Sequence, residues 1–146
     1  MDEKINDVFY KGSTMLGLFK TKRKTATILV VDDEPDLVST IKARLEWNKF
    51  KVETASNGSL ALEKLESFVP DLILLDGNMP VMSGFQMLEI MRQDNRFKSI
   101  PVIMLTAVCE SNNIALAGSL GVTEYVTKPF EYPLLLEKIT SIVDKE

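Results

Sequence analysis

Five polar residues in this sequence stand at the ends of short apolar runs, and their types suggest one kind of chemistry. Asp32 and Asp33 follow the first run, Asp76 the third, Thr106 the fourth and Lys128 the fifth. Three carboxylates brought close together repel one another, and at least one of them stays protonated unless a cation compensates the charge. Because the ligands on offer are oxygens, the cation they predict is hard, Mg²⁺ with Mn²⁺ as a second possibility.

A carboxylate beside such an ion is suited to act as a nucleophile in phosphoryl transfer, which would give an acyl phosphate. The ion would accept phosphoryl oxygens as further ligands. The ammonium group of Lys128 can pair with the incoming charge, and the hydroxyl of Thr106 can donate to a phosphoryl oxygen. Any one of these residues alone fits an ordinary polar loop start, but five chemically matched groups favour a site.

Composition excludes several other kinds of site. The chain of 146 residues contains no histidine and a single cysteine, Cys109. Histidine-based triads and zinc or haem sites built from His and Cys clusters are therefore excluded. A single cysteine cannot cross-link the chain, which suits a reducing compartment. No apolar run approaches the roughly 18 to 20 residues of a membrane span, so we expect no transmembrane segment and a cytoplasmic location.

Charge divides the chain into two parts. Residues 1–26 carry a net charge of +3, and residues 27–146 carry −7. An acidic body argues against direct DNA binding by the main domain, because phosphate contacts need clustered Lys and Arg. We therefore expect an N-terminal extension over 1–26, with a flexible tail favoured over a docking segment or a membrane-surface anchor, and one globular domain over 27–146.

Five apolar runs alternate with segments of helical period throughout the main domain. The runs are rich in β-branched residues and predict buried strands, whereas the intervening apolar residues recur every three or four positions and predict one-sided helices. Strands that are apolar on both faces and joined by helices form a parallel sheet covered on both sides. The carboxyl ends of such strands share one edge, where α/β sheets bind ligands. The predicted strands are Ile28–Val31, Val52–Ala55, Leu72–Leu75, Val102–Leu105 and Tyr125–Val126.

Four pieces of the sequence resemble the receiver domains of two-component response regulators. They are Val30–Pro35 (VVDDEP), Leu74–Gly84 (LLDGNMPVMSG), Met104–Ala107 (MLTA) and Tyr125–Phe130 (YVTKPF), in the order found in that family. The resemblance runs from about Thr27 to Val143 and is specific, because all four pieces fall in register on the alternating frame. It implies a flavodoxin-like α/β fold, a doubly wound five-stranded parallel sheet of order 2-1-3-4-5 with five helices.

The resemblance also implies a role for each matched residue. Asp76 is similar to the phospho-acceptor, which takes its phosphoryl group from a sensor histidine kinase or a histidine phosphotransfer protein. Asp33, Asp76 and the backbone carbonyl of Asn78 resemble direct Mg²⁺ ligands, with Asp32 acting through water. Lys128 is similar to the lysine that forms a salt bridge with the phosphoryl group, and its bond to Pro129 is often cis in the family.

Three further expectations concern switching and lifetime. Thr106 and Tyr125 resemble the pair that signals phosphorylation to the surface of the fourth helix, fifth strand and fifth helix. Because the chain ends after the fifth helix, we expect a stand-alone receiver that controls a downstream protein target through this surface. Asn78 and Val108 are expected to flank the water that hydrolyses the acyl phosphate, so that they tune its lifetime.

Two alternative functions remain open on the sequence. A receiver-shaped scaffold would bind partners without phosphorylation, although the intact Asp76, Thr106 and Lys128 count against it. A phosphatase of the haloacid-dehalogenase type also uses a nucleophilic Asp and Mg²⁺. Its nucleophile normally follows the first strand with a second Asp two residues later, whereas Asp76 follows the third strand and Asn78 stands in the second position. We therefore expect a phospho-accepting switch and not an enzyme that turns over a substrate.

Overall fold

The computed structural model describes residues 25–107 and 111–144, which form a five-stranded parallel sheet with helices on both faces. The strand order is β2-β1-β3-β4-β5, which confirms the doubly wound arrangement expected from the resemblance. The elements, in chain order, are β1 (Thr27–Val31), α1 (Pro35–Trp47), β2 (Lys51–Ala55), α2 (Gly58–Leu65), β3 (Leu72–Asp76), α3 (Gly84–Arg92), β4 (Val102–Thr106), α4 (Ser111–Ser119), β5 (Glu124–Thr127) and α5 (Tyr132–Val143).

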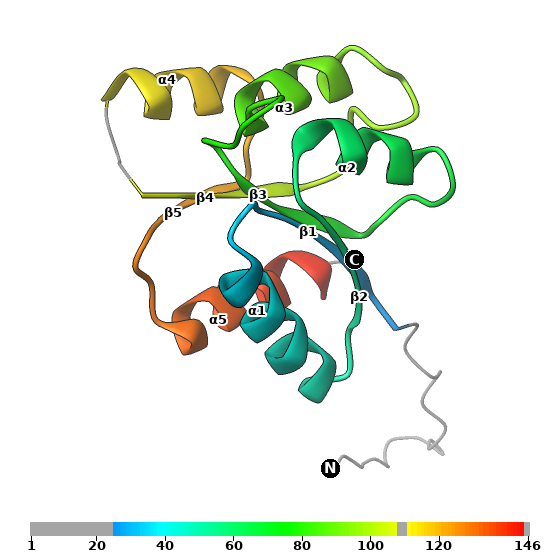
Figure 1. The fold of residues 1–146 in the computed structure, drawn as a ribbon, viewed down its shortest axis with the longest axis vertical. Coiled ribbons are helices and arrows are strands. Elements are labelled where there is room, and N and C mark those ends of the chain that lie inside the picture. The colour runs from blue at the N-terminus through cyan, green and yellow to red at the C-terminus, as the bar shows by residue number, and fades with distance from the viewer. Residues whose placement is uncertain (1–24, 108–110, 145–146) are drawn as a thin grey trace, which may run out of the picture.

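Two hydrophobic layers enclose the sheet, one on each face. Figure 1 shows α2, α3 and α4 covering one face, and α1 with α5 covering the other. Successive residues of β1 alternate between the layers: Leu29 and Val31 pack toward α2 and α3, whereas Ile28 and Val30 pack toward α1 and α5. Because both faces are covered, the central strands are apolar at every position except their ends, as the sequence pattern predicts.

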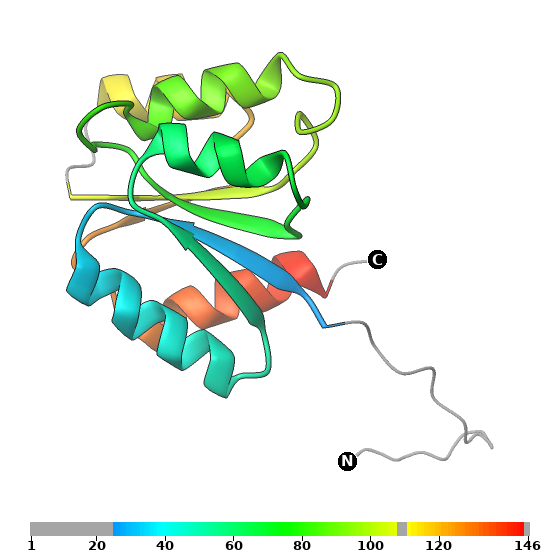
Figure 2. The same cartoon turned by 45° about the vertical axis from the view of Figure 1, so that its right-hand side comes forward.

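The strands are aligned so that their carboxyl ends meet at one edge of the sheet. Figure 2 shows the loops that follow β1, β3 and β5 leaving the sheet on the same side, opposite to the marked chain ends. This alignment fixes the position of every polar group that follows a strand. The paired residues at this edge are Val31 with Ala55 and with Leu75, Asp76 with Leu105, and Thr106 with Thr127.

Side-chain caps start two of the helices. The Asn57 side chain accepts a hydrogen bond from the backbone of Leu60 and begins α2. Ser83 and Gln86 form a reciprocal capping box that begins α3, so Ser83 is an effective cap. The cap matters for the site because α3 follows the loop that begins at Asp76.

Two arginines link the layer of α2, α3 and α4 to neighbouring loops. The guanidinium of Arg92 donates to the carbonyls of Leu120 and Gly121 and to those of Lys98 and Ile100, which links α3 to the turn before β5. Burial lowers the pKa of Arg92 from its usual value. This link fixes the C-terminal end of α4 relative to α3.

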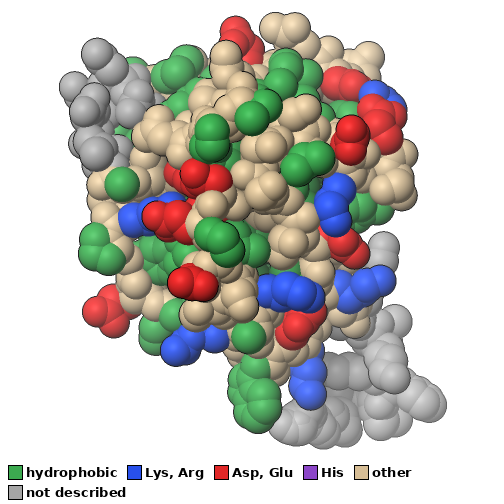
Figure 3. Space-filling view, viewed as in Figure 1, with side chains coloured by type: hydrophobic (Ala, Val, Ile, Leu, Met, Phe, Trp, Pro, Cys, Tyr) green, Lys and Arg blue, Asp and Glu red, His purple; other side chains and the backbone are tan. Residues whose placement is uncertain are grey.

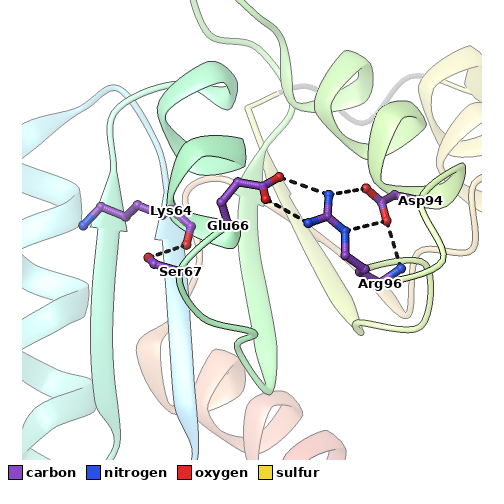
Figure 4. A network of polar contacts seen from close by, with 5 residues as sticks. All are labelled: Lys64, Glu66, Ser67, Asp94 and Arg96. Atoms are coloured by element: carbon purple, nitrogen blue, oxygen red, sulfur yellow. Dashed lines mark hydrogen bonds and ion pairs between the residues drawn. The ribbon is translucent and has the colours of Figure 1, made fainter.

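Arg96 makes a second link, between the end of α2 and the loop after α3. Figure 4 shows its guanidinium between the carboxylates of Glu66 and Asp94, at 2.8 Å from each at the closest. Hydrogen bonds from Arg96 lower the pKa of both carboxyl groups. Because the network is exposed to solvent, its contribution to stability is small.

No helix in the described part of the chain combines the length and apolar character that crossing a membrane requires. The expected N-terminal extension over 1–26 lies outside the described residues except for Thr25 and Ala26.

Candidate metal and phosphoryl site

Three carboxylates from two strands meet at the carboxyl edge of the sheet. Asp32 and Asp33 follow β1, and Asp76 is the last residue of β3. One carboxylate oxygen from each residue lies within 4.8 Å of the other two. Asp32 and Asp76 are buried, whereas Asp33 is exposed. The cluster is therefore open to solvent on the side of Asp33, where a ligand can enter.

The donor set of this cluster fits a hard divalent cation. All of its side-chain ligands are carboxylate oxygens, which Mg²⁺ and Mn²⁺ prefer, and its open side leaves room for the waters that Mg²⁺ retains. The electrostatics of the cluster also favour a bound cation. Burial, together with the charges of Asp32 and Asp33, raises the pKa of Asp76 from 3.8 to about 6, against the lowering effects of the Asn78 N–H and Lys128. A bound cation would relieve this repulsion.

Lys128, in the loop after β5, brings a positive charge to the same place. Its Nζ lies 2.8 Å from Oδ2 of Asp32, 3.6 Å from Oδ2 of Asp76 and 3.4 Å from Oε1 of Glu34. Burial lowers the pKa of the Lys128 ammonium, but the hydrogen bond that it donates to Asp32 and the neighbouring negative charges outweigh burial and raise the pKa above its usual value. In Figure 3, acidic side chains adjoin a basic one left of centre, over the loops that follow β1 and β3.

The backbone holds Lys128 in place. Its N–H donates to the carbonyl of Thr106 at 2.7 Å, which joins the ends of β4 and β5. The peptide bond between Lys128 and Pro129 is cis, as the resemblance implies. The lysine is therefore positioned by the sheet edge itself rather than by its long side chain alone.

Thr106 and Tyr125 lie on the same face of the sheet. Thr106 is fully buried at the end of β4, and Met104, two residues earlier, packs in the layer under α2 and α3. Tyr125 on β5 pairs with Met104 and is half-buried against the same layer. Side chains two residues apart on a strand share a face, so both expected switch residues lie on the α4 side of the sheet.

The structure describes only one of the two residues that are expected to control the lifetime of the acyl phosphate. The side chain of Asn78 is exposed, and its backbone N–H donates to Oδ1 of Asp76 at 3.2 Å. Val108 lies outside the described residues. The roles of Asn78 as a carbonyl ligand and of both residues in water access remain predictions.

Two residues at the site were given no role by sequence reasoning. A Cβ on Gly84 would lie 2.0 Å from the backbone oxygen of Asp76, so α3 packs directly against the peptide of the candidate acceptor. Glu34 contacts Lys128 across 94 positions of sequence. Gly84 ends the piece LLDGNMPVMSG and Glu34 lies in VVDDEP. Both residues therefore belong to the matched motifs, but the sequence does not show which contacts they make.

Comparisons with known proteins agree with this arrangement. The family model of the response regulator receiver domain matches residues 28–140. The chemotaxis protein CheY of Pseudomonas aeruginosa is 39% identical over 119 residues, which cover 81% of this chain and 96% of that protein. PhoP of Bacillus subtilis, a transcriptional regulatory protein of alkaline phosphatase synthesis, is 42% identical over 103 residues, which cover 70% of this chain and 42% of that protein.

Solved structures show the same fold. The chemotaxis protein CheY4 of Vibrio cholerae has a TM-score of 0.77 and 31% identity, covering 82% of this chain and 99% of that chain. A CheY-like receiver domain protein of Methanospirillum hungatei has a TM-score of 0.78 and 30% identity, covering 83% and 95%. A hybrid histidine kinase of Dictyostelium discoideum also matches at 37% identity over 80% of this chain, which spans only 7% of that relative. On its fold, its acidic edge and these matches, the chain belongs to the response regulator receiver domains of two-component signalling, which act as switches rather than as enzymes that turn over an external substrate.

Proposed function

We propose that this receiver accepts a phosphoryl group on Asp76 from a phosphohistidine donor, a sensor histidine kinase or a histidine phosphotransfer protein. The observation that carries the proposal is the position of Asp76. Its carboxylate ends β3, belongs to the three-carboxylate cluster and lies 3.6 Å from the ammonium of Lys128. A nucleophile for phosphorus needs nearby positive charge because the phosphoryl oxygens are anionic.

In the transfer, an Asp76 carboxylate oxygen forms the new O–P bond while the N–P bond of the phosphohistidine breaks, and the electron pair of that bond stays on the imidazole nitrogen. Lys128 neutralises charge on the phosphoryl oxygens, and the buried Thr106 hydroxyl donates to one of them. Asp33, Asp76 and the Asn78 carbonyl would hold Mg²⁺, with Asp32 acting through water. When bound, the ion supplies positive charge for the phosphoryl oxygens.

The phosphorylated state is read by a downstream protein through the surface of α4, β5 and α5. Thr106 and Tyr125 connect the site to this surface, because both lie on the face of the sheet that α4 covers. The surface suits a protein partner. The sequence of α4 contains no charged residue, and Ile114 and Leu116 on it are 45% and 42% exposed. Exposed apolar side chains on a helix without charged residues favour contact with another protein.

We propose that the receiver performs this function in the cytoplasm, where its phosphodonor and its target are reached by diffusion. We propose that Asn78 and Val108 control the access of the hydrolytic water and so set the lifetime of the acyl phosphate. Replacing Val108 by Gln speeds the loss of label, and replacing Asn78 by an aliphatic residue slows it, as measured in excess Mg²⁺ without a kinase.

Labelling with acetyl phosphate tests the proposal without a cognate kinase. We expect wild-type protein to take one phosphoryl group in the presence of Mg²⁺ and none with a chelator, and Asp76→Asn to take none under either condition. Asp36→Asn, an exposed acid in the first turn of α1, is the control and labels like wild type. Absence of label on wild type would favour a phosphorylation-independent scaffold, and continuous release of phosphate at a high rate would favour a phosphatase.

A further inference from the structure

Glu34 occupies the N-cap of α1, yet its side chain does not cap the helix. The N-cap side chain makes no hydrogen bond to the first turn. The backbone N–H of Glu34 instead donates to Oδ1 of Asp32 at 3.0 Å, and its Oε1 lies 3.4 Å from Nζ of Lys128. The side chain is therefore directed at the lysine of the phosphoryl site rather than at its own helix.

Lys128 is shared among three carboxylates, and they differ in what else they do. Asp32 and Asp76 belong to the three-carboxylate cluster, whereas Glu34 does not. The Glu34 side chain is 61% exposed, compared with 14% for Lys128 and 7% for Asp76. Glu34 thus lies on the solvent side of the ammonium, and the group that would receive the phosphoryl charge lies on the buried side.

We infer that Glu34 is a positioning residue that draws the Lys128 ammonium toward the mouth of the site and so weakens its pairing with a phosphoryl group on Asp76. The inference rests on the proposed function of Asp76. A phosphoryl group must compete with Glu34 for the same ammonium, and removal of the competitor releases the lysine to it. The exposed pair is weak, so the effect on affinity is modest.

The chain offers a matched control in Glu131. It is the N-cap of α5, it also makes no side-chain capping bond, and a proline follows in the first turn of the helix, as it does after Glu34. Within the described residues Glu131 forms no ion pair with Lys128. A variant of Glu131 therefore carries the same change of charge at the same kind of helix position without the contact.

The experiment measures binding of beryllofluoride, which stands in for a phosphoryl group on a carboxylate, to the full chain in excess Mg²⁺ by fluorine NMR or calorimetry. We expect Glu34→Gln to bind about two- to fivefold more tightly than wild type, the range that an exposed ion pair spans. Glu34→Asp should bind more tightly as well, because its shorter side chain keeps the charge but does not reach Lys128. Glu131→Gln should bind like wild type, and all three variants should keep the wild-type melting temperature within about two degrees.

A double-mutant cycle with Lys128→Met isolates the part of the effect that acts through the lysine. The gain from Glu34→Gln should be lost in the Lys128→Met background. The inference is wrong if Glu34→Gln does not tighten binding, if Glu34→Asp binds like wild type, or if the gain persists without Lys128. Failure of the proposed function looks different: wild type itself would bind no beryllofluoride and take no label from acetyl phosphate.

Discussion

The carboxyl group of Asp76 experiences two opposing influences. Burial and the charges of Asp32 and Asp33 favour its protonated form, whereas the N–H of Asn78 and the ammonium of Lys128 favour the ionised form. Burial is the largest of these effects, and the pKa rises to about 6. Without a cation, the folded protein therefore carries a cost at neutral pH for holding this carboxylate ionised, and the unfolded chain carries no such cost.

Asp76→Asn is expected to stabilise the metal-free protein at pH 7. The folded pKa is above the unfolded value, so the folded state binds the proton more tightly, and wild type loses stability as the pH rises from about 4 to above 6. A shift from 3.8 to about 6 corresponds to a gain of the order of 2 to 3 kcal/mol for the variant at pH 7. The gain should disappear near pH 3.5.

Urea unfolding in a chelator at several pH values measures this difference. Asp36→Asn, which replaces an exposed acid outside the cluster, serves as the control and should show no comparable pH-dependent gain. A difference between Asp76→Asn and wild type that is independent of pH would contradict the linkage to this carboxyl group.

At the scale of elements, the start of α3 is built against the peptide of Asp76. The N–H of Gly84 donates to the carbonyl of Gly77 at 3.0 Å, and no side chain fits between the helix and the strand. The capping box of Ser83 and Gln86 holds the helix in that position. The close contact means that the placement of α3 and the placement of the candidate acceptor depend on each other.

Gly84→Ala should therefore destabilise the fold, whereas Gly118→Ala should not. The added Cβ of residue 84 meets backbone that cannot move aside, at a cost of about 1 to 3 kcal/mol. Gly118 lies in the exposed part of α4 with nothing within 4 Å of an added Cβ, so alanine there should stabilise by up to about 1 kcal/mol. Chemical denaturation of both variants in a chelator provides the comparison, and equal effects would show that the contact at Gly84 is relieved without strain.

The strands illustrate what sequence could and could not predict about the elements. Apolar runs identified all five strands, because both faces of the sheet are covered. The ends of the strands were predicted less accurately. Asp76 is paired with Leu105 and completes β3, although the predicted run ends at Leu75. Hydrophobicity reports burial, whereas a polar residue at a strand end is held by backbone pairing that its side chain does not reveal.

The same limit applies to the candidate site. The shared edge of a parallel sheet predicts that Asp32, Asp76 and Lys128 converge, and the structure brings them together. Their roles in phosphoryl transfer remain predictions. The contact between Glu34 and Lys128 depends on the direction of two long side chains, and the raised pKa of Asp76 depends on the depth of its burial. Neither this contact nor this pKa can be deduced from the spacing of residues along the chain.

For the whole molecule, the cation site and the fold are expected to be thermodynamically linked. The carboxylates of the cluster come from two adjacent strands, β1 and β3, in the middle of the sheet. The oxygens converge only when β1 and β3 are paired, so a cation that binds them binds the folded state and not the unfolded chain. Binding of this kind stabilises the fold by an amount that increases with the logarithm of the cation concentration above its dissociation constant.

Mg²⁺ should accordingly raise the melting temperature of wild type, and Asp33→Asn should lose most of that increase. At about ten times the dissociation constant, the stabilisation is about 1.4 kcal/mol, which amounts to a few degrees for a domain of this size. Asp33 is exposed, so its replacement by Asn leaves the core intact while removing one oxygen ligand and one charge. Asp36→Asn removes an equal charge from the acidic body outside the cluster and should keep the full increase. Calorimetric scans with Mg²⁺ and with NaCl of matched ionic strength separate binding from screening. If Asp33→Asn retained the wild-type shift, or if NaCl reproduced it, the three carboxylates would not form the cation site.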